Sequence, residues 1–386
     1  MGDSSSIYSN FIRRLRSLLF ATTTGIAAGT LWSQTDESKA SIQPYAEIVL
    51  EGWSLVDGGI DPGARSMGLI DAGFDFLLSE NAEGHIGFLA FGGDRDIGAF
   101  TGDFGAYSSS ITDSQTTLFT AWLQNTFEWG TLRYDQLAPD ETFLVAETGT
   151  LFLHANFGAT PILFANAPAP AYSVGAAGVE WIGKMDAGSW QVGLYAGDPG
   201  PGDASDHGVN WKMGGDAGYL TIAERAWNYG SQANAGSVFK IGAYYHSGRF
   251  ETLETGLARY GNHAFYFVWD HQFEGQTSAF VRAGYNPKSD RSVVRNYIDL
   301  GWSISGPLGN RPEDVFGIAY SITDFTDSYL ASQDSAVSSR EQALELTYAM
   351  PIANQWDVQP SVQWIVDSHQ ANRDAYLIGL RLSAAF

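Results

Sequence analysis

Several stretches of this chain alternate apolar and polar side chains with a period of two residues. The clearest is the last segment, residues 376–386, which reads Y-L-I-G-L-R-L-S-A-A-F. Its larger apolar side chains occupy every second position: Tyr376, Ile378, Leu380, Leu382, Ala384 and Phe386. Because successive side chains of a β-strand point to opposite faces, this pattern predicts a strand with one apolar and one polar face.

The same two-faced pattern recurs along the chain. It is found in residues 68–78, 239–246, 297–304, 316–322, 344–350 and 358–366. The 386 residues include 44 glycines and 13 prolines, whose scatter leaves no room for long helices. After Trp32, no stretch approaches the roughly 18 consecutive apolar residues of a membrane-spanning helix. The sequence therefore predicts an all-β fold with many short strands.

Strands of this kind fit two architectures. In a soluble sandwich the apolar faces form the core, whereas in an outer-membrane barrel they face lipid and the polar faces line the lumen. Three features favour the barrel: strands of about 8 to 11 residues, aromatic side chains near strand ends, and a final strand that ends in phenylalanine. The polar faces also combine charged and amide side chains with glycine, which suits a water-filled lining.

The connections between the expected strands alternate in length. Short turns rich in glycine or proline separate some strands, and longer acidic or glycine-rich loops are expected at residues 92–110, 197–216, 247–257 and 323–340. At about 22 residues per strand and connection, the chain predicts a transmembrane antiparallel β-barrel of about 16 strands, of the outer-membrane porin type.

The N-terminus has the pattern of an export signal. Residues 11–16 read F-I-R-R-L-R, and a short stretch of apolar and small residues follows at 17–32. A basic patch before a short apolar run is typical of a secretory signal peptide. We therefore expect residues 1–34 to be removed and residues 35–386 to form one barrel domain in the outer membrane of a Gram-negative bacterium. The alternative is a cytosolic chain with an N-terminal amphipathic helix.

Composition excludes several classes of function. The chain has a net charge of −22, which disfavours nucleic acid as a partner. It contains no cysteine, so disulfides, thiolate metal sites and cysteine nucleophiles are excluded. The seven histidines are dispersed, and neither G-x-S-x-G nor H-E-x-x-H occurs. We therefore predict no catalytic residues, no cofactor and no metal site.

A channel needs inward side chains that can replace the hydration of its permeant. The candidates for the lining of the lumen are Glu47, Asp71, Asp75, Asn156, Lys240, Tyr244, Arg282, Glu345, Gln359, Gln363 and Arg381. All except Asn156 are placed on polar strand faces by the alternation. For each of them, a solvated wall position without a special role is the alternative. Arg133 is left unassigned because the register of residues 126–134 does not resolve.

Asn156 belongs to an unusual segment, residues 156–172, which reads N-F-G-A-T-P-I-L-F-A-N-A-P-A-P-A-Y. This segment is apolar and proline-rich and has no strand period. A connection of that length without secondary structure is uncommon unless it is functional. Our hypothesis is that it folds into the lumen and narrows it; the alternative is an extracellular loop packed on its neighbours.

Several motifs, in order, resemble the OprB-type carbohydrate-selective porins. They are R-A-G-Y-N-P at 282–287, Y-I-D-L-G-W-S-I-S-G-P-L-G-N-R-P-E-D-V-F-G-I-A-Y at 297–320, A-L-E-L-T-Y-A-M-P-I at 343–352 and W-D-V-Q-P-S-V-Q-W-I at 356–365. Residues 156–161 and 170–179 are similar to a stretch in the first half of the barrel. The resemblance covers most of residues 145–386. It implies a sixteen-stranded barrel that passes sugars such as glucose down a gradient.

The function expected from these observations is a passive outer-membrane channel, not an enzyme. Its partners are small sugars as permeants and outer-membrane lipid, and outward glycine and alanine patches would permit a homotrimer. The excess of acidic residues predicts a preference for cations over anions. Two alternatives remain: a secreted or outer-membrane β-rich glycosidase or sugar-binding protein, and a structural barrel or adhesin that is plugged by its loops.

Overall fold

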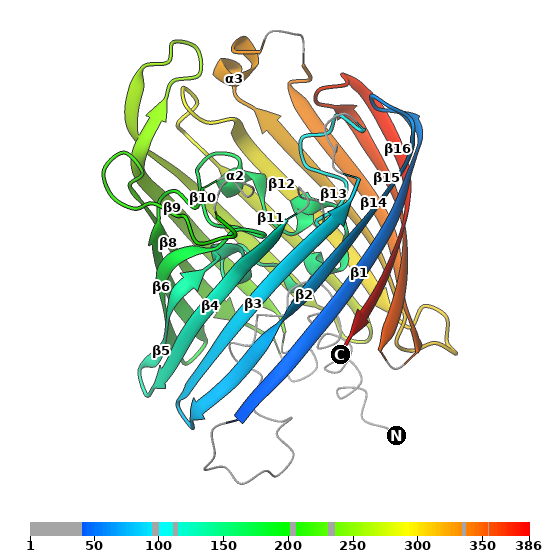
Figure 1. The fold of residues 1–386 in the computed structure, drawn as a ribbon. Helices are drawn as coiled ribbons and strands as arrows, with labels where there is room; N and C mark the ends of the chain where they lie inside the picture. The colour runs from blue at the N-terminus through cyan, green and yellow to red at the C-terminus, as the bar shows by residue number, and fades with distance from the viewer. Residues whose placement is uncertain are drawn as a thin grey trace.

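The computed structural model describes residues 41–94, 100–110, 115–200, 206–230, 236–333, 337–353 and 355–386. The expected signal peptide, residues 1–34, lies outside the described residues. Over the described part, sixteen antiparallel strands form one closed barrel in which each strand pairs with its neighbours in sequence and β1 pairs with β16 (Figure 1). The predicted fold class is confirmed.

The strands follow one another along the chain with few helices between them. They are β1 (Ser41–Gly58), β2 (Gly63–Ser79), β3 (Ala82–Gly93), β4 (Thr116–Phe127), β5 (Gly130–Leu137), β6 (Ala176–Met185), β7 (Gly188–Ala196), β8 (Tyr219–Asn228), β9 (Val238–Glu251), β10 (Ala258–Gln272), β11 (Thr277–Tyr285), β12 (Val294–Ser305), β13 (Val315–Phe325), β14 (Arg340–Ala353), β15 (Trp356–Ser368) and β16 (Arg373–Ala385).

Short helices occupy two of the connections. The 3₁₀-helices η1 (Pro139–Glu141), η2 (Glu147–Leu151) and η3 (Ala155–Phe157) and the α-helix α2 (Pro161–Phe164) lie between β5 and β6, and α3 (Asp327–Ala331) follows β13. Within the described residues, no helix is both long enough and apolar enough to cross a membrane.

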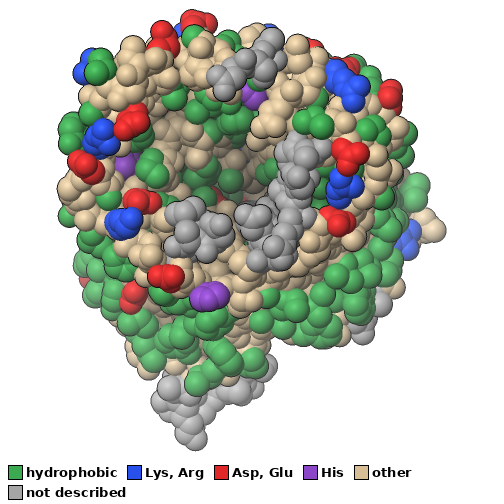
Figure 2. Space-filling view, turned by 45° about the horizontal axis from the view of Figure 1, so that its top comes forward, with side chains coloured by type: hydrophobic (Ala, Val, Ile, Leu, Met, Phe, Trp, Pro, Cys, Tyr) green, Lys and Arg blue, Asp and Glu red, His purple; other side chains and the backbone are tan. Residues whose placement is uncertain are grey.

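The outer surface of the barrel is apolar. Ile378 and Leu380 of β16 are 54% and 50% exposed. Arg381, the residue after Leu380, is 2% exposed and faces inward. Figure 2 shows the same division, with hydrophobic side chains on the outer wall and charged ones around the rim of a hollow. The apolar faces predicted from the alternation therefore point away from the lumen, as a membrane barrel requires.

The strands and connections differ in length from the expectation. β5 has 8 residues and β1 has 18, so the longest strands exceed the predicted 8 to 11. In these strands, the backbone hydrogen bonds between neighbouring strands continue beyond the minimum length that crosses a bilayer. The loop expected at residues 247–257 is shorter than predicted, since β9 extends to Glu251 and β10 begins at Ala258. Short turns lie at the end of the barrel that carries the C-terminus (Figure 1).

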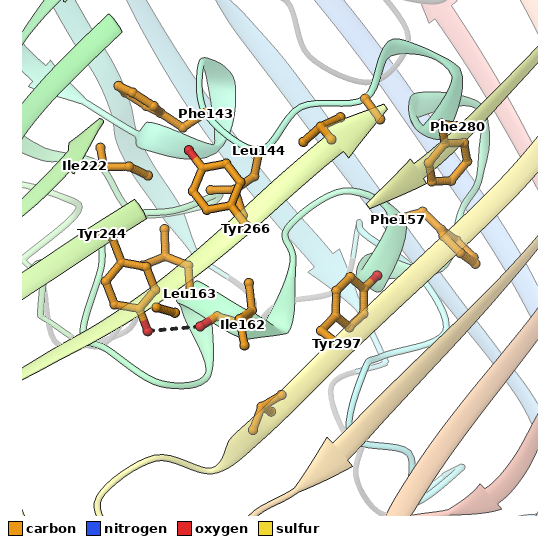
Figure 3. Packing of buried hydrophobic residues seen from close by; sticks show 14 of the residues in the cluster. Phe143, Leu144, Phe157, Ile162, Leu163, Ile222, Tyr244, Tyr266, Phe280 and Tyr297 are labelled. Carbon is orange, nitrogen blue, oxygen red and sulfur yellow. Dashed lines mark hydrogen bonds between the residues drawn. The ribbon is translucent and has the colours of Figure 1, made fainter. Parts of the chain in front are cut away.

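The inner face is not polar throughout, which corrects the simple expectation from the alternation. A buried apolar cluster joins inward side chains of β8 to β13, such as Leu220, Ile222 and Phe280, to side chains of the β5–β6 connection, such as Leu144 and Phe157 (Figure 3). Apolar wall residues are stable there because the connection covers them from inside and removes them from water. Part of the barrel interior is therefore a packed core.

Candidate functional site

Two connections turn into the barrel and fill part of its interior. The described residues 100–110, between β3 and β4, include buried Phe100 and Tyr107. Residues 138–175, between β5 and β6, include the helices η1 to η3 and α2, which Figure 1 shows inside the ring of strands. The two segments also contact each other, because Ser109 donates its backbone N–H to Leu153 O at 2.8 Å. We call them the 100–110 segment and the 138–175 segment.

Arg282 on β11 is the main polar anchor of the 138–175 segment. Its guanidinium forms a buried ion pair with Asp299 on β12, and the side chains are 2% and 0% exposed. The same guanidinium donates to four backbone carbonyls of the segment, those of Leu144, Asn156, Phe157 and Gly158. Tyr297 adds a hydrogen bond to Asn156 O at 2.8 Å. Arg282 therefore holds the segment, and its donors are committed to the protein itself.

Three further candidates, on β14 and β15, hold the two segments in the same way. The Glu345 carboxylate accepts the backbone N–H groups of Leu153 and His154, each at 2.9 Å at closest. Gln359 donates to Leu151 O at 2.7 Å and Gln363 donates to the carbonyl of Tyr107 at 2.8 Å. Gln363 also lies 3.4 Å from Glu345. These three side chains therefore hydrogen-bond to the backbone of the two inward segments.

Two more candidates, Lys240 and Tyr244 on β9, contact the 138–175 segment from the opposite part of the wall. Lys240 Nζ donates to Val145 O at 2.9 Å and lies 3.7 Å from Glu224. Tyr244 Oη donates to Ile162 O at 3.0 Å, the bond drawn in Figure 3. Asn156 itself lies in η3, where its side chain donates to Ser321 Oγ at 3.3 Å.

Arg381 on β16 anchors the 100–110 segment. Its Nε donates to Glu51 Oε1 on β1 at 2.7 Å, and its Nη2 reaches Ser110 Oγ at 3.1 Å. The side chains of the pair are 2% and 0% exposed. This buried pair also spans β1 and β16, the strands whose pairing closes the barrel.

The remaining candidates lie on a different part of the wall, low on β1 and β2. Glu47 and Asp71 are directly paired across these strands, and Asp71 accepts a hydrogen bond from Tyr45 Oη at 3.1 Å. Asp75 Oδ1 lies 2.8 Å from His85 Nδ1, and its side chain is 57% exposed. With half-buried Glu83 on β3, the residues Tyr45, Asp71 and Asp75 form a surface that we call the acidic patch.

A stack of rings that sequence reasoning missed supports the acidic patch. The His85 ring lies between those of Tyr45 and Trp122, with centroid distances of 5.6 and 5.3 Å, and the Arg133 guanidinium lies 4.3 Å from the Trp122 ring centroid. A Cβ atom on Gly87 would lie 2.7 Å from His85 Nε2, so the stack needs glycine there. Arg133 pairs with Gln124 across β4 and β5, which settles its register.

Burial changes the protonation of titratable groups in the inward segments. Burial raises the pKa of Asp140, which accepts the backbone N–H of Tyr172 at 2.8 Å, to about 7. It raises the pKa of Asp103 to about 6 and lowers the pKa of His154 to about 3. His154 Nε2 and Asp103 Oδ2 lie 3.8 Å apart. His154 is therefore neutral at pH 7.

The structure divides the sequence-predicted residues into two groups. Eight of them contact the inward segments or lie within them: Asn156, Lys240, Tyr244, Arg282, Glu345, Gln359, Gln363 and Arg381. The other three are Asp71 and Asp75, which belong to the acidic patch, and Glu47, which is paired with Asp71 across β1 and β2. Among the described residues, no group of three or more acidic or histidine side chains could hold a metal ion.

A closed barrel of sixteen antiparallel strands, apolar outside and partly filled by inward connections, defines a porin of the bacterial outer membrane. A family model described as "Carbohydrate-selective porin, OprB family" matches residues 90–386. Because this match covers most of the chain, the protein belongs to the OprB family.

Solved structures agree with this fold. OprB of Pseudomonas putida, at high pH, is similar with a TM-score of 0.79 and 16% identity, over 89% of this chain and 94% of that chain. The outer-membrane channel DcaP of Acinetobacter baumannii has a TM-score of 0.59 and 11% identity, over 92% and 100% of the two chains. An anion-selective porin from Comamonas acidovorans has a TM-score of 0.58 and 10% identity, over 90% and 100%. No curated protein sequence gave a significant match.

Replacing Arg282 tests whether the 138–175 segment sets the width of the pore. In R282M the four carbonyls lose their donor and Asp299 loses its partner. Removing one partner of a buried ion pair lowers the stability of the folded protein by about 3–5 kcal/mol. We expect a looser segment and a higher single-channel conductance in a planar bilayer. R282M/D299N removes the unpaired charge as well, so that the loss of the carbonyl bonds is measured alone.

The matched control is R311M, since Arg311 bonds Asp314 in the β12–β13 connection and Pro351 on β14, and not the inward segments. We expect it to leave conductance unchanged. If both Arg282 variants fold and conduct like the wild type, the segment does not limit the pore.

Asp140 predicts a pH dependence of stability. Its pKa of about 7 in the folded protein lies above the ordinary value of 3.8, so its contribution to stability is complete below about pH 4 and is lost as the pH rises through about 7. D140N keeps an acceptor for Tyr172 and removes this titration. Between about pH 5 and pH 8, thermal unfolding in detergent should show a smaller loss of stability for D140N, by about 1–4 kcal/mol. D186N, in an exposed turn, is the control, and equal pH profiles for wild type and D140N would contradict the assignment.

Proposed function

We propose that this porin passes small neutral sugars of the size of glucose by passive diffusion, and that they move along the acidic patch. The observation that carries the proposal is the division of the inner wall. The inward ion pairs Arg282–Asp299 and Arg381–Glu51 are buried, whereas Asp75 remains 57% exposed. We therefore assign the acidic patch, around exposed Asp75, as the polar wall along which the permeant moves.

The chemistry of this wall suits a sugar. Carboxylates and a tyrosine accept and donate hydrogen bonds, and such groups replace the hydration of sugar hydroxyls during passage. Asp71 and Asp75 form no ion pair with any described arginine or lysine, so their oxygens are less committed than those of Asp299 or Glu51. The same carboxylates favour cations over anions, as the net charge of the chain suggested.

Liposome swelling with a panel of mono- and disaccharides tests the function. We expect the reconstituted protein to speed swelling in monosaccharides more than in disaccharides, and the sugars to be recovered unchanged. D71N/D75N should slow monosaccharide flux and reduce cation preference measured by reversal potential, because two carboxylates leave the path. E274Q, in an exposed turn outside the barrel interior, is the matched control.

Two results would contradict this proposal. Absence of sugar-dependent swelling would reject the sugar channel, and hydrolysed sugar in the vesicles would favour the glycosidase alternative. Normal swelling with D71N/D75N would support the sugar channel but reject the path along the acidic patch.

The homotrimer stays a prediction. Small side chains recur on the outer face of β1 to β3, where they would allow close approach of a second barrel: Gly52, Ser54, Ser66, Gly68, Ala90 and Gly92. Cβ atoms added to Gly52 and Gly92 would point into open space. Native mass spectrometry in mild detergent should give three times the mass of one chain and a single chain for G52W. A wild type with the mass of one chain would reject the trimer.

A further inference from the structure

An arginine lies on the lipid-facing side of the barrel, near the end that carries the short turns. Arg225 is on β8, where Leu220, Ile222 and Glu224 face inward, so the alternation turns Arg225 outward. It precedes the end of the strand at Asn228 by three residues, which is about 10 Å along a strand. A cation on this face is costly near the middle of the bilayer and tolerated near the interface.

Two tryptophans fix the position of this guanidinium. Arg225 Cζ lies 5.6 Å from the ring centroid of Trp190 and 4.9 Å from that of Trp227. Trp190 is the direct partner of Arg225 across β7 and β8, and Trp227 is the next outward residue on β8. Both rings are outward, 44% and 36% exposed. Tryptophans in such a belt sit at the level of the lipid headgroups.

The hydrogen bonds that Arg225 forms within the described residues go to neutral backbone carbonyls. Nη1 donates to Ser189 O and Ala226 O, both at 2.9 Å. Within the described part of the chain, no carboxylate forms an ion pair with Arg225, although the residue is only 7% exposed. A buried cation is stable when an anion pairs with it and accepts its remaining N–H groups.

We propose that Arg225, held between Trp190 and Trp227, binds the phosphate of a phospholipid at the short-turn rim of the barrel. A phosphodiester supplies the missing negative charge and accepts hydrogen bonds from the guanidinium fork. Outward Val192 and Leu194 lie further along β7, and Ile241 is the direct partner of Arg225 across β8 and β9. They are 37%, 43% and 46% exposed, so they offer an apolar surface to the acyl chains. The site is outside the lumen and independent of the sugar path.

Native mass spectrometry of the full-length protein in a maltoside detergent tests the site. The probes are phosphatidylglycerol and a diacylglycerol with the same acyl chains but no phosphate. We expect the wild type to retain phosphatidylglycerol about tenfold more strongly than diacylglycerol, as one charge-assisted contact allows. In R225Q this preference should disappear, while the amide can still donate to one of the carbonyls.

The matched control is R259Q. Arg259 is an exposed residue at the opposite rim, on β10, and forms no ion pair with any described carboxylate. The substitution removes the same charge where no pair of tryptophans flanks it, so the preference for phosphatidylglycerol should persist. W227L is the second variant: it keeps the charge, and loss of one cation–π contact should weaken retention about threefold.

Three outcomes would overturn the proposal. They are equal retention of phosphatidylglycerol by wild type and R225Q, an equal loss in R259Q, and displacement of the bound lipid by a large excess of inorganic phosphate. If R225Q does not fold, retention by W227L at the wild-type level overturns it. Swelling and conductance should be normal in all three variants, so failure here leaves the channel function untouched.

Discussion

The pairing of β1 with β16 is the constraint on which the rest of the structure depends. It closes the sheet, so that backbone N–H and C=O groups along both strands are satisfied without an open edge in lipid. Sixteen strands then enclose an interior wider than wall side chains alone can fill. Such an interior is filled either by water or by segments of the protein chain. In this protein two connections occupy part of it, whereas Asp75 on β2 stays exposed.

The inward connections need polar anchors because they bring many backbone groups into the barrel. A buried N–H or C=O without a partner is costly, and these segments have too little regular structure to satisfy their own. The wall supplies the partners: Arg282 donates to carbonyls, and Glu345 accepts N–H groups. Charged residues on β11 and β14 that the alternation assigned to a wet lining thus serve mainly as partners of the loop backbone. The apolar cluster around Phe280 and Ile222 adds the hydrophobic contribution.

The sequence allowed the barrel and its sidedness to be predicted because the strand period is local. Ile378, Leu380 and Arg381 reveal their faces from spacing alone. β8 could not be resolved in this way, since Leu220 and Ile222 face an inner core while Trp227 faces outward, and apolar residues on both faces remove the period. The contacts of Arg282 could not be predicted either, because Asn156 and Leu144 lie 126 and 138 residues away along the chain. No local sequence pattern encodes such partners. The stack of His85 on Trp122 depends on the register of β3 and β4, for the same reason.

The distribution of charge bears on the permeant that we propose, a neutral sugar. The buried arginines at positions 282 and 381 are each neutralised by a carboxylate, so they contribute little field to the open part of the lumen. In the acidic patch Asp75 is exposed, so its field is partly screened by water and its oxygens are available as hydrogen-bond acceptors. A sugar loses no Coulomb energy beside these carboxylates and gains acceptors for its hydroxyls, whereas an anion is repelled by them. Selection against anions and acceptance of sugars can thus arise from the same few side chains, provided that the inward segments bring the permeant close to that wall.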